Sequence, residues 1–579
     1  MTHEADQSLQ HHFTHKGDLY EWNKSFYAPE SCPTPQQLVQ STDEYTFDNA
    51  ICLISDRNQY AVAYCNAALS AHSTIDLNLC YIFPFDPLHR YILLDLLPFV
   101  ARKNNIQVRI ICDTITMGSM LLKSAFEINT TLRSSLTNEQ KLNALKTPGM
   151  SFLDYLPPSS PPFYHAKEEF PTVLSFLRAL NNIASTFVPN DLLQIKWWCV
   201  RDAKMKYPIK NHIKCHIFDS HKVICGGSNV APLVGNIDCD LHLSGVAAEK
   251  YQKIFNDMWY VSTSSISQQF IKGRCSSGSL EMDCVNPEKV LVQVSEGMAV
   301  VTPPKSLADP TLHDGSDLAS LGTVITLDTV VSSLSLDIID YSKSPGEPNS
   351  SSNTYCYSVW TDDTCSIAVV QSCPSSDGED VIFRYVLGCI ATAKKSIIMC
   401  MGHCNVPMAM SQALASATER GVEVKIMINS WYSSDLRCGQ RDLFISLKDL
   451  IRLAPKVRVY VTALPSQIKQ RQNNKVDALR GYQEGDKKAE FLHSKYVVVD
   501  TNWSAVGSWN MWTRGSFYEM ESELFVFSES LAEKLEEKFH CERERCTVEI
   551  QGVEDCNFFC PKGCKLCKQF GPFFMDGNK

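Results

Sequence analysis

One polar pattern occurs twice in this 579-residue chain and constrains the fold more than any other feature. The segment HIKCHIFDSHKVICGGSN begins at His212, and HSKYVVVDTNWSAVGSWN begins at His493. After each His, a Lys follows at +2, an Asp at +7, a Gly at +14, an Asn at +17 and an acidic residue at +28. This coincidence indicates an internal duplication, so the chain is expected to contain two similar halves.

The duplicated pattern selects the candidate site residues. In order, they are His212, Lys214, Asp219, Gly226, Gly227, Asn229 and Asp240 in the first copy, and His493, Lys495, Asp500, Gly507, Ser508, Asn510 and Glu521 in the second. Apolar residues between each Lys and Asp predict a strand, a turn at the Asp and a short return strand. Because side chains two apart on a strand share a face, each His and Lys are expected to project together. Small residues at the following bend would let main chain and Asn amide approach a bound oxyanion.

The order of predicted elements is similar in the two halves. In the first half, strands at 75–83 and 106–112 flank a helix at 87–105. The second half has helices at 380–395 and 407–420, the latter stopped by Gly421, and strands at 396–404 and 422–429. Further strands are predicted at 193–200 and 457–462. The alternation of strand and helix predicts an α/β layered fold with a parallel or mixed sheet.

Composition suggests five segments along the chain. They are a leader at 1–45, a first domain at 46–275, a Ser/Thr/Pro-rich insertion and linker at 276–365, a second domain at 366–540 and a Cys-rich tail at 541–579. No signal peptide is recognisable at the amino terminus, and no apolar run approaches the roughly 20 residues of a membrane-spanning helix. We therefore expect a protein that is cytoplasmic or peripheral on a membrane surface.

The residue types in the pattern are suited to phosphate chemistry. Two ammonium groups and two amides can hold the non-bridging oxygens of a phosphodiester while a bond to phosphorus breaks. Two imidazoles suit a two-step displacement, in which one attacks phosphorus and the other moves protons. The acids at +28 would hydrogen-bond the imidazoles and fix their tautomers. This scheme requires neither a metal nor a cofactor.

At these residues the chain resembles the phospholipase D superfamily, whose signature HxK(x)4D(x)6G-small-x-N occurs twice. The segment DLHLSGVAAEKYQKIFNDMW at 240–259 and the helix–strand region after Ala393 are similar to cardiolipin synthase-like phosphatidyl transferases. The similarity covers roughly residues 46–270 and 366–540. It implies two α/β/α sandwich halves with one active site at their interface.

The resemblance also implies roles for the repeated residues. His212 would be the nucleophile of a phosphohistidine mechanism and His493 the general acid. The implied catalytic set is His212, Lys214, Asp219, His493, Lys495 and Asp500, with Asp219 and Asp500 as structural members. The implied substrate-binding set is Asn229, Asn510, Gly226, Gly227, Gly507 and Ser508, and the supporting carboxylates are Asp240 and Glu521.

Three functions fit this pattern. The first is a phosphodiesterase or phosphatidyl transferase acting on glycerophospholipids, with phospholipid substrate and peripheral membrane association. A superfamily nuclease that cleaves DNA or RNA is an alternative, and a non-catalytic phospholipid-binding, membrane-remodelling protein is a second. The formal net charge of −10 disfavours broad nucleic-acid binding and favours lipid. The oligomeric state stays open.

Two further features have more than one interpretation. Short Cys spacings in the tail suggest a zinc site, but palmitoylation and unmodified thiols are equal alternatives; the residues are Cys556, Cys560, Cys564 and Cys567. Basic residues precede both motifs and are either solvated loops or groups that attract a phosphodiester. These residues are Lys204, Lys206, Lys210, Lys469, Arg471, Lys475, Arg480, Lys487 and Lys488.

Overall fold

The computed structural model forms two compact units. It describes residues 45–83, 86–113, 116–117, 180, 192–198, 209–233, 235–262, 361–372, 381–404, 406–430, 440–472, 489–511, 519–553 and 555. Unit 1 contains the described residues up to Ser55, the segment Gly235–Leu241 and the described residues from Thr361 onward. Unit 2 contains the described residues from Asp56 to Leu233 and from His242 to Ser262. The insertion at 276–360 and the tail from 556 lie outside the described residues.

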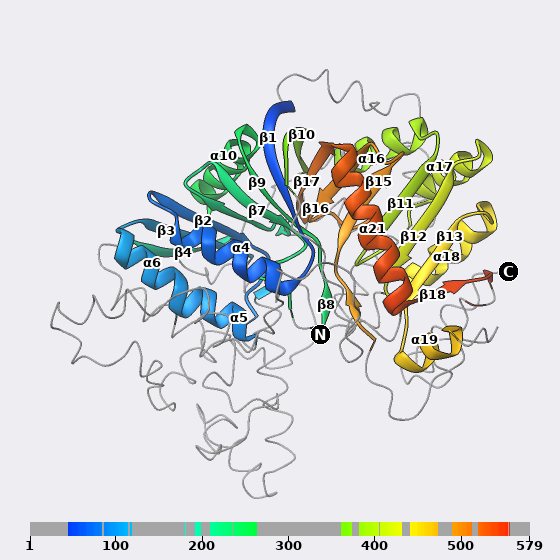
Figure 1. The fold of residues 1–579 in the computed structure, drawn as a ribbon, viewed down its shortest axis with the longest axis horizontal. Coiled ribbons are helices and arrows are strands. Elements are labelled where there is room, and N and C mark those ends of the chain that lie inside the picture. The colour runs from blue at the N-terminus through cyan, green and yellow to red at the C-terminus, as the bar shows by residue number, and fades with distance from the viewer. Residues whose placement is uncertain are drawn as a thin grey trace, which may run out of the picture. The chain divides into compact units, whose positions relative to one another are not determined.

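Unit 2 is built mainly from the first half of the sequence (Figure 1). Its elements are α4 (Arg57–Leu69), β2 (Thr74–Leu79), α5 (Pro87–Arg90), η2 (Tyr91–Leu96), α6 (Leu97–Asn104), β3 (Gln107–Asp113), β4 (Leu193–Trp198), β5 (Lys210–Asn211), β6 (Cys215–Phe218), β7 (Lys222–Gly226), β9 (Asp240–Ser244), which starts in unit 1, and α10 (Val246–Val261). Its strands follow the order β7-β6-β2-β3-β4. The pairs β2–β3 and β3–β4 are parallel, whereas β2–β6 and β6–β7 are antiparallel.

Unit 1 is built mainly from the second half of the sequence. Its elements are β1 (Tyr45–Ile54), β8 (Asn236–Ile237), β10 (Thr361–Ser372), α16 (Val381–Thr392), β11 (Ser396–Met401), α17 (Met408–Glu419), β12 (Glu423–Ile428), α18 (Gln440–Leu453), β13 (Arg458–Thr462), α19 (Pro465–Gln472), β14 (Phe491–Leu492), β15 (Lys495–Val499), β16 (Trp503–Gly507), β17 (Glu519–Phe527), α21 (Glu529–Cys546) and β18 (Thr547–Ile550). Its strands follow the order β18-β13-β12-β11-β15-β16-β17-β10-β1. The pairs β11–β12 and β12–β13 are parallel, and the other pairs along this path are antiparallel.

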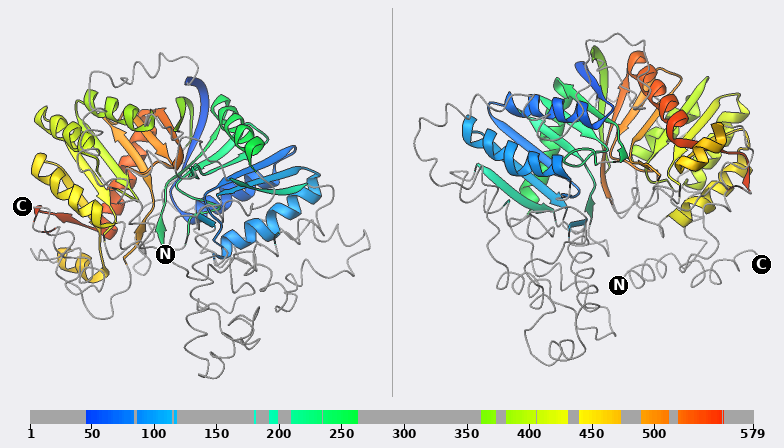
Figure 2. Two further views of the ribbon diagram at one scale, coloured as in Figure 1. Left: turned by 180° about the vertical axis from the view of Figure 1, so that it is seen from behind. Right: turned by 60° about the horizontal axis from the view of Figure 1, so that its bottom comes forward.

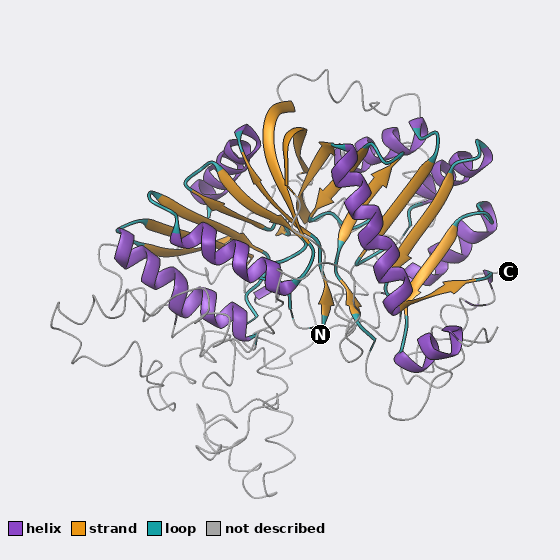
Figure 3. Ribbon diagram, in the orientation of Figure 1, coloured by secondary structure: helices purple, strands orange, loops and turns teal. Residues whose placement is uncertain are grey.

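Each unit has helices on both faces of its sheet, as Figure 3 shows. In unit 1, α21 covers one face and α16, α17 and α18 cover the other, which is seen from behind in Figure 2. The apolar side chains of these three helices form one buried core with β11, β12 and β13. In unit 2, α10 packs on β2, β4 and β6, whereas α4 and α6 lie on the opposite face. The predicted α/β sandwich in each half is therefore confirmed.

Local sequence explains several element boundaries. The Asp56 side chain accepts hydrogen bonds from Asn58 and Gln59 amides at the start of α4. Gly421, at φ +88°, ends α17 as predicted, because glycine adopts a left-handed conformation without a Cβ clash. The predicted 87–105 helix instead contains the π-helical η2 ahead of Pro98. Proline has no N–H to donate to the preceding turn, so the regular helical pattern changes there.

The two units share one pattern of strands. In unit 2, β2 pairs in parallel with β3 and antiparallel with the motif strand β6. In unit 1, β11 pairs in the same way with β12 and with the motif strand β15. Asp219 N–H donates to the Thr74 carbonyl, and Asp500 N–H donates to the Ser396 carbonyl, both over 2.9 Å. Thr74 and Ser396 are thus equivalent positions, and the duplication extends from sequence to register.

β1 pairs with β10 in unit 1, although it precedes the first motif in the chain. The sequence boundary at residue 46 would have grouped this strand with the first domain. Strand pairing between segments more than 300 residues apart leaves no signal in local composition, which explains why the compact units and the sequence segments divide the chain differently.

Candidate functional site

Both motif histidines lie just ahead of a strand. β6 begins at Cys215, three residues after His212, and β15 begins at Lys495, two residues after His493. Both histidines therefore precede the strand on which the sequence placed them.

The two motif lysines are buried. Lys214 is 1% exposed and Lys495 0%. Lys214 Nζ donates to the His212 carbonyl over 2.6 Å, and Lys495 Nζ donates to the His493 carbonyl over 2.5 Å. Because burying an ammonium is costly unless it is paired, each lysine is a positive charge kept next to its own histidine backbone.

The motif aspartates hold loops. Asp219 Oδ1 accepts main-chain hydrogen bonds from His72, Ser73 and Thr74. Asp500 accepts the corresponding bonds from Lys394, Lys395 and Ser396. Burial would raise the pKa of Asp219, but hydrogen bonds from the Ser73 hydroxyl and the loop amides lower it overall. In both copies, the carboxylate fixes the turn that leads into the adjacent strand.

The motif asparagines present an amide nitrogen without a partner among the described residues. Asn229 Oδ1 accepts the amides of Cys80 and Tyr81, each over 3.0 Å, and Asn510 Oδ1 accepts that of His403 over 3.1 Å. Both Nδ2 atoms are buried and have no hydrogen-bond partner there. An unpaired buried donor is costly, and this one recurs at equivalent positions of the two repeats.

Small residues close the bends beside these asparagines. Gly226 has φ +154°, and Gly227 is buried next to it. A Cβ at Gly507 would collide with the Ser522 carbonyl oxygen and the Glu523 side chain, and would lie 2.8 Å from Glu523 Cα. Glycine at position 507 is therefore required by the close approach of β17.

The acidic residues at +28 both lie on strands. Asp240 begins β9 and is 1% exposed. Glu521 lies on β17, where its Oε2 accepts a hydrogen bond from Ser508 Oγ over 2.6 Å. Ser508 Oγ in turn accepts from the Ser522 amide over 3.0 Å. Glu521 therefore orients the small residue of the second motif.

The carboxylate paired with His493 is Asp238, which the repeat did not single out. His493 Nδ1 lies 2.8 Å from Asp238 Oδ1, and both side chains are buried. Burial alone would raise the pKa of Asp238, but His493 and Lys495 lower it overall. A carboxylate on Nδ1 holds one imidazole tautomer and favours the protonated ring. In the sequence, the one feature that could have pointed to Asp238 is its place two residues before Asp240.

Main-chain pairing brings Asp238 to His493 within unit 1. β8 and β14 form a parallel pair that joins Ile237 to Leu492. The His493 and Ser494 amides both donate to the Ile237 carbonyl over 2.8 Å. The segment before Asp238 and the segment before His493 are thus aligned by the backbone.

The candidate residues fall into two sets. Unit 1 brings together His493, Lys495, Gly507, Ser508, Asn510 and Glu521 with Asp238, and it also contains Asp500 and Asp240. Unit 2 contains His212, Lys214, Asp219, Gly226, Gly227 and Asn229. The tail cysteines, Cys556, Cys560, Cys564 and Cys567, lie outside the described residues, as do most of the basic residues that precede the motifs.

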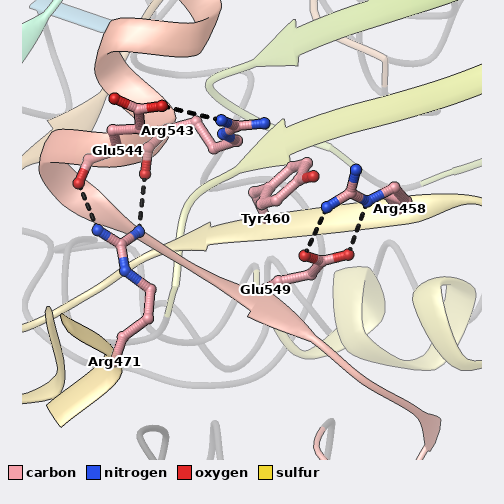
Figure 4. Close-up of a pocket in the computed structure, with 6 residues that line it drawn as sticks. All are labelled: Arg458, Tyr460, Arg471, Arg543, Glu544 and Glu549. Atoms are coloured by element: carbon pink, nitrogen blue, oxygen red, sulfur yellow. Dashed lines mark hydrogen bonds and ion pairs between the residues drawn. The ribbon is translucent and has the colours of Figure 1, made fainter. Parts of the chain in front are cut away.

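A separate pocket in unit 1 has a volume of about 270 Å³ (Figure 4). It is lined by Arg458, Tyr460, Arg471, Arg543, Glu544 and Glu549. Arg458 pairs with Glu549 through two bonds of 2.9 and 3.0 Å, and Arg543 pairs with Glu544 over 3.1 Å. Arg471 donates to main-chain carbonyls at the end of α21. These guanidinium groups are engaged within the protein, so the cluster links α19, α21, β13 and β18.

Comparisons with known proteins find similar proteins in the family that the doubled motif resembles. A family model described as cardiolipin synthase, PLD-like domain matches residues 386–542. Cardiolipin synthases of Clostridium perfringens strains SM101 and 13 are 25% identical over 179 residues, which is 28% of this chain and 29% of each relative. The alignment thus spans less than a third of these relatives' length.

The fold comparison agrees with the sequence comparison. Phosphatidylserine synthase of Haemophilus influenzae Rd KW20 superimposes with a TM-score of 0.51 at 12% identity, covering 93% of this chain and 97% of that one. None of the helices in the described residues is long and apolar enough to cross a membrane. Residues 386–542 therefore match a cardiolipin synthase, PLD-like domain, and the doubled motif of the chain resembles the phospholipase D superfamily signature.

Proposed function

We propose that this protein transfers or hydrolyses phosphatidyl groups of glycerophospholipids through a phosphohistidine. The observation that carries the proposal is the repeated set of buried groups in each motif. Each set has a histidine, a lysine whose ammonium donates a hydrogen bond to the main-chain carbonyl of that histidine, and an asparagine. The Nδ2 of the asparagine has no hydrogen-bond partner among the described residues. The cardiolipin synthase-like family model supports phospholipid as the substrate class.

In the first step, His212 attacks phosphorus. A nitrogen–phosphorus bond forms while the bond from phosphorus to the leaving alcohol's oxygen breaks, and His493 donates a proton to that oxygen. Asp238 stabilises the protonated ring of His493 through Nδ1, which leaves Nε2 to donate.

In the second step, the phosphatidyl group passes from His212 to the acceptor. The acceptor hydroxyl gives its proton to His493 and attacks phosphorus, and the nitrogen–phosphorus bond breaks to release His212. With water as acceptor the protein acts as a phospholipase D. With a lipid hydroxyl as acceptor the reaction is a phosphatidyl transfer of the kind that makes cardiolipin.

The lysines and asparagines hold the phosphate in both steps. Lys214 and Lys495 supply positive charge, and the Asn229 and Asn510 amides supply fixed donors for the non-bridging oxygens. Such donors cost no reorganisation when charge develops, which is the main source of electrostatic catalysis. We expect the protein to meet this substrate at a phospholipid surface.

The test compares wild-type protein with His212→Ala and His493→Ala. Phosphatidylglycerol and phosphatidylcholine vesicles and single-stranded DNA are offered separately, in the presence of chelator. We expect lipid conversion by wild type and loss of at least about 10³-fold in both variants, because the nucleophile or the acid is removed. Product analysis separates cardiolipin from phosphatidic acid.

The matched control removes a histidine that lies outside both motifs. His540→Ala removes a partly exposed side chain of α21 that pairs with Glu536, and the variant should retain wild-type conversion. Cleavage of DNA without lipid conversion would move the protein to the nuclease class. Wild-type inactivity on both substrates, with vesicle binding retained, would replace the catalytic proposal with a phospholipid-binding role.

A further inference from the structure

Asp113 is the last residue of β3, and Asn429 directly follows β12; each is hydrogen-bonded to the residue before the motif histidine. Since Thr74 and Ser396 are equivalent, the strand registers make Asp113 equivalent to Asn429. Both side chains are buried, with exposures of 0% and 1%. The repeat therefore has a carboxylate in one half where the other half has an amide.

In unit 1, Asn429 holds both polar groups of the residue before His493. The Leu492 amide donates to Asn429 Oδ1 over 2.7 Å, and Asn429 Nδ2 donates to the Leu492 carbonyl over 2.5 Å. Asn429 Nδ2 also donates to the Gly402 carbonyl over 2.6 Å. An amide is required here, because one side chain must accept and donate at the same time.

Gly402, which directly follows β11, lies against the main chain of the same histidine. A Cβ at position 402 would lie 3.0 Å from the Leu492 carbonyl oxygen and 3.1 Å from His493 Cα. The Gly402 amide donates to the Ser494 carbonyl over 3.0 Å. His493 is thus enclosed by contacts on the residues immediately before and after it.

In unit 2, Asp113 takes the equivalent position with acceptor groups only. Its Oδ1 accepts the Asn211 amide over 2.9 Å, and its Oδ2 accepts the Thr116 amide over 2.6 Å. The Asn211 side chain donates to Asn78 Oδ1, so the residue before His212 is held through its own side chain as well. The two repeats therefore use different chemistry to fix the same piece of main chain.

We propose that Asn429 and Asp113 are positioning residues for His493 and His212, and that position 429 requires an amide whereas position 113 requires only an acceptor for the Asn211 amide. The proposal rests on the proposed function, because it assigns the two histidines to catalysis. Each residue acts one peptide away from the imidazole and touches no reacting atom. Displacement of a catalytic group by about 1 Å can cost 10²-fold in rate, so these contacts are expected to affect turnover rather than substrate binding.

Exchange of the two residues gives the sharpest test. In Asn429→Asp, the second carboxylate oxygen would face the Gly402 and Leu492 carbonyl oxygens, and we expect kcat to fall about 10- to 100-fold with KM within about twofold. Asp113→Asn keeps an acceptor for Asn211, and we expect a loss of no more than about fivefold. Asn429→Ala and Asp113→Ala remove every bond and should each reduce kcat about 10- to 100-fold.

Thr418→Val is the control for a buried polar substitution away from both motifs. Thr418 lies on α17, is 5% exposed, and its hydroxyl donates to the Ala415 carbonyl over 2.8 Å. We expect this variant to lose stability and keep kcat within about twofold of wild type. Equal kcat in Asn429→Asp and wild type, or equal losses from the two exchanges, would overturn the proposal.

A second readout separates this proposal from the proposed function. Diethylpyrocarbonate acylates accessible imidazoles, and peptide mass spectrometry resolves His493, which is 7% exposed. Asn429→Asp should increase the His493 labelling rate about threefold or more, whereas Thr418→Val should not change it. If wild type converts no lipid but the labelling rates change as expected, only the proposed function is rejected. If Asn429→Asp leaves the His493 labelling rate unchanged, the positioning role of Asn429 is rejected.

Discussion

His493 Nδ1 lies 2.8 Å from Asp238 Oδ1, although the two residues are 255 positions apart in the chain. The contact joins the second motif to a short segment that follows the first motif, and both belong to unit 1. Because Asp238 holds the ring through Nδ1, Nε2 is the nitrogen to which the proposed mechanism assigns proton transfer.

Asp238→Asn should reduce kcat by about 10²- to 10⁴-fold, because an amide can hold the wrong tautomer and does not stabilise the charged ring. The measurement is the rate of phosphatidyl release from vesicles. Glu549→Gln is the matched control, since it removes one charge from a partly exposed pair with Arg458. Wild-type turnover in Asp238→Asn would show that the pairing does not contribute.

Asn510→Asp should abolish most activity while leaving the fold intact. The Oδ1 acceptor for the His403 amide remains, but the unpartnered Nδ2 becomes a carboxylate oxygen that repels phosphate. We expect a loss of about 10²- to 10³-fold in kcat, as for removal of an oxyanion donor, and a melting temperature near wild type. The exposed turn variant Asn502→Asp is the control. Comparable activity in both variants would contradict a binding role for Asn510.

Gly507→Ala should destabilise unit 1. The added Cβ would collide with the Ser522 carbonyl oxygen, which is fixed backbone of β17. Overpacking of this kind costs about 1–3 kcal/mol, measured as a change in the free energy of unfolding in urea. Gly552→Ala, where an added Cβ meets nothing within 4 Å, should change stability by less than about 1 kcal/mol. Similar unfolding midpoints for the two variants would argue against the close approach.

The stability of unit 2 should depend on pH through His216. Burial lowers the pKa of His216 to about 4 from 6.5, so between these values only the unfolded state binds the proton. The free energy of unfolding of unit 2 therefore falls as pH is lowered from about 6.5 to about 4, by on the order of 3 kcal/mol from this group.

The comparison of wild type with His216→Gln isolates this effect. Burial raises the pKa of Asp113 to about 6, which acts in the opposite direction, but that group is present in both proteins. Urea unfolding at pH 7, 6 and 5 should show a shallower loss in the variant. Parallel pH curves for the two proteins would mean that His216 does not titrate with unfolding.

Much of the site was predictable because it is encoded locally and twice. The His, Lys, Asp, Gly and Asn positions follow from the spacing within two short segments, and the α/β elements follow from apolar periodicity and helix stop signals. The π-helical η2 and the strand starts after His212 and His493 were not predicted. Hydrogen-bond geometry decides them, and residue type alone does not.

By itself the sequence determined the duplication, the α/β sandwich of each half and the identity of the paired motif residues, since these depend on local order along the chain. Tertiary structure alone decided that Asp238 pairs with His493, that β1 joins unit 1 and that Asn429 and Asp113 hold the chain before the histidines. The physical reason is that these contacts join segments distant in sequence. Strand pairing selects such contacts through backbone hydrogen bonds, which carry no residue-type signature.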